Sequence, residues 1–166
     1  MEVAVLFLEI RGRRCALPVP AVREVFTIAD VTPVPGAPAV VRGVTPLRGQ
    51  AVPLIDLGSW LGHGASDPLD PHALAKTAIL IEGHAGDDAE GGETPRAALL
   101  VDRVLRVGRV DRDARLTAPG HIPFVTATVA DAGAPALLLD AAAALDMVRT
   151  AVAATAKGES ERSRSA

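Results

Sequence analysis

Side chains that could perform catalysis are scattered along this chain rather than grouped. The single cysteine, Cys15, lies in an apolar segment, and no histidine and aspartate pattern points to it as a nucleophile. Ser59 does not sit in the Gly-x-Ser-x-Gly turn of serine hydrolases. The four histidines lack the spacing of zinc ligands: His63, His72, His84 and His121. We therefore expect no enzymatic activity and no cofactor.

An acidic run is the remaining candidate for metal binding. Asp87, Asp88 and Glu90 stand close together among glycines, but they lack the alternating spacing and the distal glutamate of a calcium-binding loop. The surrounding residues 83–95 hold too few apolar side chains to become ordered by burial. We expect a solvated, mobile loop there and no metal site.

The segment from Gly43 to Leu57 favours recognition over catalysis. Two glycines, Gly43 and Gly49, bracket Arg48. Glycine adopts positive φ values that other residues resist, so the chain is expected to turn sharply beside this arginine. A short apolar run follows at 51–55. Because Pro53 has no N–H, we expect this strand to be an edge strand, a strand start or a bulge.

Composition narrows the class of partner. The 166 residues carry a net charge of −3, and 49% are hydrophobic but only 2% aromatic, so one core of Val, Leu, Ile and Ala is expected. The acidic balance and scarce aromatic side chains disfavour nucleic acid and anionic membranes as partners. One cysteine allows no intramolecular disulfide, and the first apolar run is too short to cross a bilayer and has no basic residues before it. We expect a cytoplasmic protein.

Short strands dominate the predicted secondary structure. Apolar and β-branched runs between turn residues indicate strands, whereas long helical patterns are few. Short helical segments are expected only at Pro20 and at 57–62. The predicted strands cover 3–10, 14–17, 51–55, 76–82, 96–101, 102–110, 124–129 and 136–139. This pattern is typical of all-β barrels or a sandwich and disfavours a parallel α/β fold.

The C-terminal region predicts one helix. Asp140 is a favoured N-cap and precedes an alanine-rich run, which predicts a helix over 141–155 followed by a disordered tail over 157–166. An apolar strand segment that ends in aspartate and leads into a helix occurs twice, at Asp56 and at Asp140. The repetition indicates two similar halves.

These motifs together resemble the CheW-like family of bacterial chemotaxis. The matching segments are Arg23-Glu24-Val25, Thr32-Pro33-Val34-Pro35, Gly43 to Gly49, Val52 to Leu57, and Leu100 to Val104. The resemblance runs from about Val5 to Leu145. It implies two five-stranded SH3-like barrels that share a core, with an end helix packed on the first barrel. The CheW-like domain would cover 1–150, with its subdomains divided near 63–76, and 151–166 would form the helix end and tail.

The resemblance also implies a non-catalytic adaptor, recruited from the cytoplasm to membrane-associated receptor arrays without inserting into the membrane. Such a protein joins the regulatory domain of a CheA-type histidine kinase to a chemoreceptor signalling tip. Glu24 and Arg48 resemble the family's oppositely charged pair. The positions that match receptor-binding residues are Glu24, Gly43, Arg48, Gly49, Ala78, Ile79, Val104 and Val107. Those that match kinase-binding residues are Leu6, Val19 and Val22, for which an ordinary core role stays open.

The same resemblance allows a second function. An accessory CheW-like protein of a pilus or gliding pathway would bind only the receptor or only the kinase. Two departures from the family pattern bear on the choice of receptor. Ala98 replaces a glycine common in the family, and 124–129 lacks the usual isoleucine-x-glycine pattern.

Overall fold

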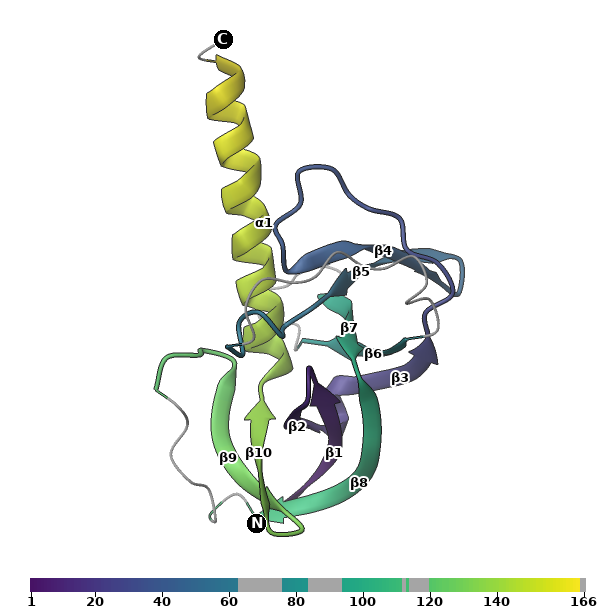
Figure 1. Ribbon diagram of the computed structural model, residues 1–166, viewed down its shortest axis with the longest axis vertical. Helices are drawn as coiled ribbons and strands as arrows, with labels where there is room; N and C mark the ends of the chain where they lie inside the picture. The colour runs from purple at the N-terminus through teal and green to yellow at the C-terminus, as the bar shows by residue number, and fades with distance from the viewer. Residues whose placement is uncertain (63–75, 84–93, 112, 114–119, 165–166) are drawn as a thin grey trace.

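The computed structural model describes residues 1–62, 76–83, 94–111, 113 and 120–164. Ten β-strands, one short 3-10 helix and one α-helix make up these residues (Figure 1). In chain order the elements are β1 (Glu2–Ile10), β2 (Arg13–Pro18), η1 (Val19–Ala21), β3 (Val22–Thr27), β4 (Val41–Leu47), β5 (Gln50–Ile55), β6 (Thr77–Glu82), β7 (Arg96–Val101), β8 (Arg103–Asp111), β9 (Val125–Asp131), β10 (Ala134–Leu139) and α1 (Ala141–Arg164). The predicted all-β class with a C-terminal helix is confirmed.

The strands form two five-stranded barrels. Barrel A has the strand order β8-β1-β2-β10-β9, so it combines strands from both ends of the chain, and barrel B has the order β3-β6-β7-β5-β4. The C-terminal strands β9 and β10 therefore belong to the same barrel as β1 and β2. The expected division near 63–76 is wrong, because β5 and β6 on either side of it belong to the same sheet. Residues 63–75 themselves lie outside the described part.

The two barrels have the same internal plan. Strands β8, β9, β10, β1 and β2 of barrel A correspond, in that order, to β3, β4, β5, β6 and β7 of barrel B. Each pair of neighbouring strands in barrel A has the same parallel or antiparallel arrangement as the corresponding pair in barrel B. The repeated aspartates occupy matching places. The Asp56 N–H donates to the Val40 carbonyl before β4, and the Asp140 N–H donates to the Phe124 carbonyl before β9. The two similar halves predicted from the sequence are thus the two barrels. Barrel A is formed by strands from both ends of the chain, and barrel B by the strands between them.

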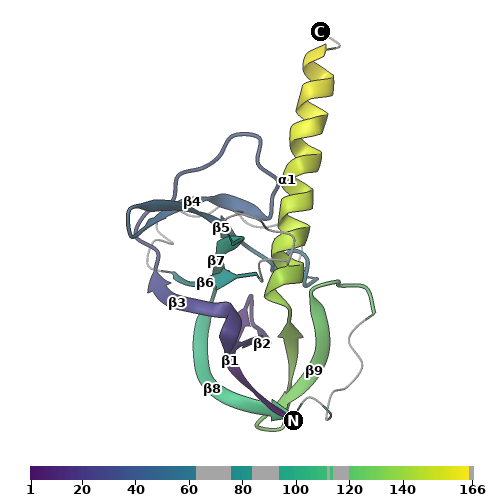
Figure 2. The same cartoon turned by 180° about the vertical axis from the view of Figure 1, so that it is seen from behind.

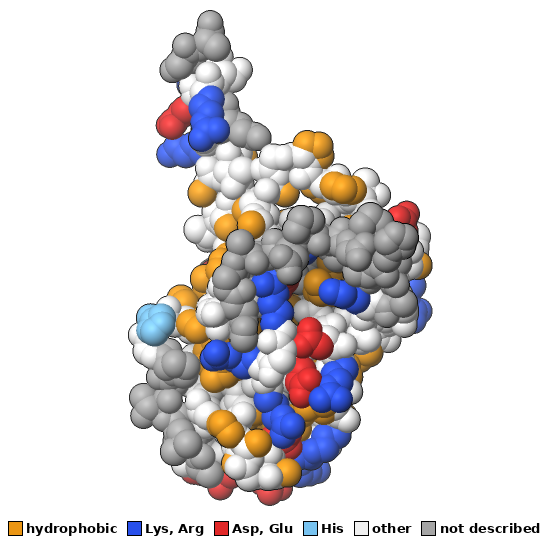
Figure 3. All heavy atoms as spheres, viewed as in Figure 1, with side chains coloured by type: hydrophobic (Ala, Val, Ile, Leu, Met, Phe, Trp, Pro, Cys, Tyr) orange, Lys and Arg blue, Asp and Glu red, His pale blue; other side chains and the backbone are white. Residues whose placement is uncertain are grey.

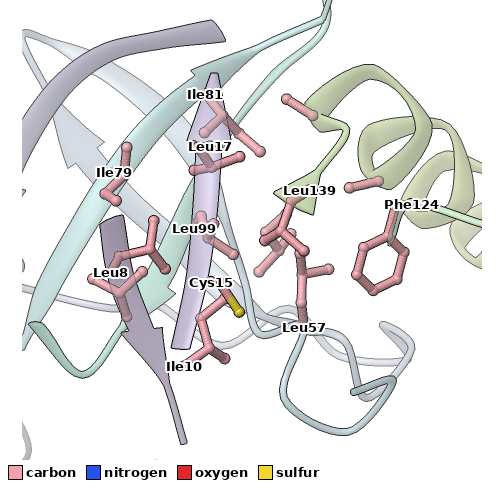
Figure 4. Packing of buried hydrophobic residues seen from close by; sticks show 14 of the residues in the cluster. Leu8, Ile10, Cys15, Leu17, Leu57, Ile79, Ile81, Leu99, Phe124 and Leu139 are labelled. Carbon is pink, nitrogen blue, oxygen red and sulfur yellow. The ribbon is translucent and has the colours of Figure 1, made fainter. Parts of the chain in front are cut away.

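Alternate residues of the central strands serve different cores, which explains their nearly continuous apolar runs. One side of β1, β2, β6 and β7 contributes to a core shared by both barrels, to which Leu8, Cys15, Ile79 and Leu99 belong (Figure 4). The other side fills a barrel interior, as Phe7 does in barrel A and Leu80 in barrel B. Because side chains alternate along a strand, both faces of these strands are buried.

Arg-Gly and Ala-Gly dipeptides make the tight hairpin turns. Both central residues have positive φ, as two-residue type I′ turns require: Arg11 (47°) and Gly12 (74°), Arg48 (50°) and Gly49 (78°), Ala132 (48°) and Gly133 (84°). The sharp turn predicted beside Arg48 is therefore present. It joins β4 to β5 and holds Arg48 at its tip.

Pro53 lies in an interior strand, contrary to the sequence-based expectation of an edge, a strand start or a bulge. Its partner on β4 is Val44, whose N–H and C=O both bond to Thr32 rather than to β5. The β5–β7 ladder pairs Leu54 and Ile55 and does not include Pro53. The proline therefore occupies the place in the sheet where a donor is not needed, which is how an interior strand accepts it.

Helix α1 begins as predicted and ends later. The Ala143 N–H donates to Asp140 Oδ1 at 3.0 Å, so Asp140 is the N-cap. Leu145 and Val148 are buried in the shared core. The helix continues to Arg164, nine residues beyond the predicted end and through most of the expected disordered tail, and extends past both barrels (Figure 2). No proline interrupts this segment, and Arg162 and Arg164 in the last turn suit the negative end of the helix dipole. Among the described helices, none is both long and apolar enough to span a membrane.

Candidate partner-binding surface

The predicted pair of Glu24 and Arg48 is formed. Arg48 Nε donates to Glu24 Oε2 at 3.0 Å and its Nη2 to Oε1 at 3.1 Å, so the contact is bidentate. The hydrogen bonds to Glu24 raise the pKa of Arg48 above its ordinary value. Glu24 lies on the edge strand β3, and the turn at Arg48 and Gly49 presents the guanidinium to it. The arginine is largely exposed, so the pair is open to a partner.

Gly43, also matched to a receptor-binding position, has a structural role. It stands in β4 at a register shift, with φ of 144°, and an added Cβ would lie 2.4 Å from the Thr32 carbonyl oxygen. Gly43 is buried. Its contribution to a surface is therefore indirect, because it lets the 31–38 connection approach β4. Gly49, by contrast, is exposed and supplies the second positive φ of the turn.

Exposed valines stand on one edge strand of each barrel, beside the shared core. Val107 of β8 is paired with Leu6 of β1, and Val25 of β3 is paired with Ile79 of β6. Side chains of directly opposed residues point to the same side of a sheet, and Leu6 and Ile79 both belong to the shared core. Val107 is 64% exposed and Val25 45% exposed. Val104, paired with Leu8, is half-buried against the same core. We call Val25, Val104 and Val107 the valine surface.

Three residues matched to binding positions are not at the surface. Ala78 and Ile79 are fully buried, Ala78 in the interior of barrel B and Ile79 in the shared core. Both lie on a strand that is buried on its two faces, so neither reaches a partner. Leu6, matched to the kinase side, is also a core residue, and its core role is the correct one. Val19 and Val22, at η1 and the start of β3, remain half-buried and accessible.

The structure adds residues that the sequence analysis did not assign. Val25 takes the place on the surface that was expected for Ile79, and its position next to Glu24 was the available signal. The second addition is Arg106, which the shared plan of the two barrels identifies. Val107 of barrel A corresponds to Val25 of barrel B, and Arg106 corresponds to Glu24. Arg106 contacts Asp131 beside the β9–β10 turn, as Glu24 contacts the β4–β5 turn. The sequence motif alone gave no signal for this second pair.

Asp131 and its arginines form a cluster at the mouth of barrel A. The carboxylate is buried and accepts from Arg106 and, at 3.2 Å, from Arg14 Nη1. The Arg106 guanidinium stacks over the Phe7 ring, with Cζ 4.7 Å from the ring centroid. A Cβ on Gly108 would lie 2.8 Å from Phe7 and 2.6 Å from Arg106. Because β8 and β9 are the two edge strands of barrel A, the pair of Arg106 and Asp131 also links those edges.

Cys15 is the one cysteine of the chain, and its thiol is buried. Burial raises the pKa of the Cys15 thiol to about 12, so thiolate chemistry at neutral pH is disfavoured. Within the described ranges no three His, Cys, Asp or Glu side chains group as metal ligands would. His121 is exposed, whereas His63, His72, His84 and the acidic run at 87–90 lie outside those ranges. Ala98, one of the two departures from the family pattern, is buried inside barrel B and leaves the surface unchanged.

Comparisons with known proteins agree on one family. The model of the CheW-like domain matches residues 4–149. The chain is 43% identical over 54 residues to a chemotaxis protein CheW of Rhizobium meliloti, a match that covers 32% of this chain and 35% of that protein. It is 32% identical over 109 residues to chemotaxis protein CheW of Thermotoga maritima, covering 66% of this chain and 63% of that protein. The matched regions thus span less than two thirds of these relatives' own lengths.

A solved structure shows the same fold. The crystal structure of the scaffolding protein TtCheW from Thermoanaerobacter tengcongensis superposes with a TM-score of 0.65, covering 84% of this chain and 90% of that one, at 21% sequence identity. The paired barrels and the family match over 4–149 describe the same part of the chain. This chain belongs to the CheW-like family.

Proposed function

We propose that this protein is a non-catalytic adaptor that couples chemoreceptors to a CheA-type histidine kinase in a chemosensory array. The observation that carries the proposal is the valine surface on the shared-core side of β3 and β8, together with the exposed pair of Glu24 and Arg48 on the other side of β3. Exposed apolar side chains are typical of protein–protein contact surfaces. Membership of the CheW-like family supports chemotaxis as the setting.

The receptor side is assigned to the valine surface and to the pair of Glu24 and Arg48. An extended sheet edge with exposed valines suits an apolar stripe on a helical partner, such as the signalling tip of a chemoreceptor. The pair of Glu24 and Arg48 contributes orientation and partner choice, because exposed ion pairs add little to affinity or stability. Gly43 and Gly49 support this surface through backbone shape.

The kinase side is assigned to Val19 and Val22. Both are partly exposed valines at the transition from barrel A to barrel B, one on η1 and the other at the first position of β3. Val22 lies three residues before Val25 on β3 and points to the same side of the sheet. Whether both partners bind at the same time is therefore a question for experiment.

Co-sedimentation tests the proposal with the purified chain, the cognate receptor tip in vesicle-bound form and the cognate kinase. The chain is expected to pellet with receptors and to carry the kinase with it. Binding to only one partner would instead identify an accessory protein of a pilus or gliding pathway. Pelleting with neither would refute the adaptor function.

Charge reversal tests the assigned site. Arg48→Glu is expected to weaken receptor binding about ten-fold while leaving the thermal midpoint nearly unchanged. Arg149→Glu is the matched control, because Arg149 is similarly exposed and also pairs with a carboxylate, Asp146, but lies on α1. Equal effects of the two substitutions would remove the Glu24 and Arg48 pair from the binding site.

A further inference from the structure

The β1–β2 turn of barrel A, formed by Arg11 and Gly12, is bonded to barrel B and to the crossing between the barrels. Arg11 Nη2 donates to Asp56 Oδ2 at 2.6 Å, and Asp56 directly follows β5 of barrel B. The Gly12 N–H donates to Asp102 Oδ2, also at 2.6 Å. Asp102 is the single residue between β7 of barrel B and β8 of barrel A. One turn of barrel A therefore holds both the end of β5 and the start of β8.

The pair of Arg11 and Asp56 is shielded from water. Figure 3 shows charged side chains of both signs at the surface over barrel A. In this pair, however, the aspartate is only 5% exposed and the arginine 25% exposed. Asp56 Oδ1 also accepts from the Gly58 N–H at 2.9 Å. Because separating a shielded pair leaves a buried charge without its counterion, the contact resists displacement.

The segment that follows this pair, 57–62, packs on barrel A. Leu57 is buried in the shared core, and the Trp60 ring lies 6.0 Å from that of Phe124, which precedes β9 of barrel A. Figure 4 shows Leu57 between Phe124 and Ile10, the last residue of β1. A segment that leaves barrel B is thus held on barrel A, and the arginine of the β1–β2 turn fixes the point where it starts.

The valine surface depends on how the two barrels are placed, because its valines come from both of them. Val25 lies on β3 of barrel B, whereas Val104 and Val107 lie on β8 of barrel A. Asp102, which accepts from Gly12, stands two residues before Val104. A partner that contacts β3 and β8 together needs the two rows of valines at a fixed spacing. If that spacing varies, only part of the molecules is competent to bind, and the apparent affinity falls by that fraction.

We infer that Arg11 and Gly12 are positioning residues for the receptor. Through Asp56 and Asp102 they hold β8 in place relative to β3, and so they set the affinity of the valine surface without belonging to it. The inference rests on the proposed receptor-binding function and adds what preorganises that surface. A surface that is already assembled in the free protein spends less binding free energy on ordering.

Gly58 offers a substitution that displaces Arg11 without removing its charge. A Cβ on Gly58 would lie 2.5 Å from Arg11 Nε and closer still to its Cδ, and Gly58 has no positive φ that an alanine would strain. Gly58→Ala and Arg11→Ala are each expected to weaken binding of the cognate receptor tip about two- to ten-fold. In the double variant Gly58→Ala should add nothing, because the three atoms nearest to its methyl group all belong to Arg11. Arg11→Lys should restore part of the loss, since it keeps the charge.

Spin labels measure the spacing of the two edge strands directly. Thr27→Cys on β3 and Arg109→Cys on β8 provide exposed attachment sites in the full chain, and the buried Cys15 stays unlabelled. The distance distribution between the labels is expected to be narrow when Arg11 and Gly58 are intact. It should broaden or shift in Gly58→Ala and in Arg11→Ala, and a purely structural contribution to stability would not change it in folded molecules.

Val129→Ala is the control for lost stability. It removes buried methyl groups inside barrel A, away from the β1–β2 turn, so it should lower stability but keep the label distance and the receptor affinity. All binding is measured where circular dichroism shows each variant to be folded. If Gly58→Ala and Arg11→Ala also keep both the label distance and the receptor affinity, the inference is wrong while the adaptor function stands.

Two further outcomes are decisive. An effect of Gly58→Ala that persists in the Arg11→Ala background would mean that the methyl group does not act through Arg11, which overturns the inference. Absence of receptor binding in the wild type would instead refute the proposed function. The label distances would then still decide whether Arg11 holds β8 relative to β3.

Discussion

Replacement of Gly43 by alanine separates a structural role from a contact role at a predicted binding position. The backbone at Gly43 has φ of 144°, a region that residues with a Cβ rarely adopt. The new methyl group would also lie 2.4 Å from the Thr32 carbonyl oxygen and 2.9 Å from Val31 Cγ1. Thr32 cannot easily retreat, because its N–H and C=O both bond to Val44 at 2.9 Å. The substitution must therefore strain β4, move the 31–38 connection, or both.

The magnitude follows from three contributions. Backbone strain at such a φ costs about 1–3 kcal/mol. Overpacking against a fixed neighbour costs about 1–3 kcal/mol. Reduced freedom of the unfolded chain returns about 0.4–1 kcal/mol. The free energy of unfolding is thus expected to fall by about 1–6 kcal/mol, a large share of the roughly 5–15 kcal/mol typical of a domain.

Urea denaturation followed by circular dichroism measures this change, with Gly49→Ala as the control. Gly49 also has a positive φ, 78°, but no heavy atom lies within 4 Å of its added Cβ. Its substitution is expected to cost only about 1–2 kcal/mol. If Gly43→Ala is no less stable than Gly49→Ala, the reasoning about the close approach is refuted. If Gly43→Ala keeps wild-type stability but loses receptor binding, Gly43 is a contact residue and its assignment as structural is wrong.

Further predictions concern the buried thiol, the barrel A cluster and one surface pair. Cys15 should not react with Ellman's reagent at pH 8 in the native chain and should react fully in urea. Its raised pKa of about 12 adds stability that is present below the ordinary value of 9.0 and lost as pH rises toward 12; rapid native labelling would contradict this. Asp131→Ala should cost about 2–3 kcal/mol in chemical denaturation, because two arginines lose a buried partner that links the edges of barrel A; a change below about 0.5 kcal/mol would refute that role. The hydrogen bond from Arg103 lowers the pKa of Glu9, so the stability difference between wild type and Glu9→Gln should be present above pH 4.5 and shrink as pH falls below it. A difference that stays constant from pH 6 to pH 3 would show that the pair does not titrate in this way.

The family motifs were sufficient to predict the pair of Glu24 and Arg48 and the turn that presents it. The turn depends on local chemistry, since Gly49 supplies a backbone conformation that few other residues adopt. The strands and the N-cap at Asp140 were predictable for the same reason. Local rules were misleading at Pro53, because the cost of its missing N–H depends on whether the opposing residue needs a donor. The opposing residue, Val44, directs its backbone N–H and C=O to Thr32 rather than to Pro53.

Surface positions were harder to predict because burial is a property of the assembled sheets. Ala78 and Ile79 stand next to each other on β6, and each is buried in a different core. In the linear sequence a strand buried on both faces and a strand with one exposed apolar face can look alike. Val25 and Val107 are exposed only because β3 and β8 are edge strands, which the sequence order of the elements does not reveal.

The amino-acid sequence by itself determined the all-β class, the hairpin turns, the helix start and the family, because these depend on residues close together in the chain. Tertiary structure decided that barrel A is built from both ends of the chain, which valines stay exposed, and that Arg106 meets Asp131 from the opposite edge strand. Those features depend on contacts between residues far apart in sequence. Such contacts exist only once the two barrels have closed around their shared core.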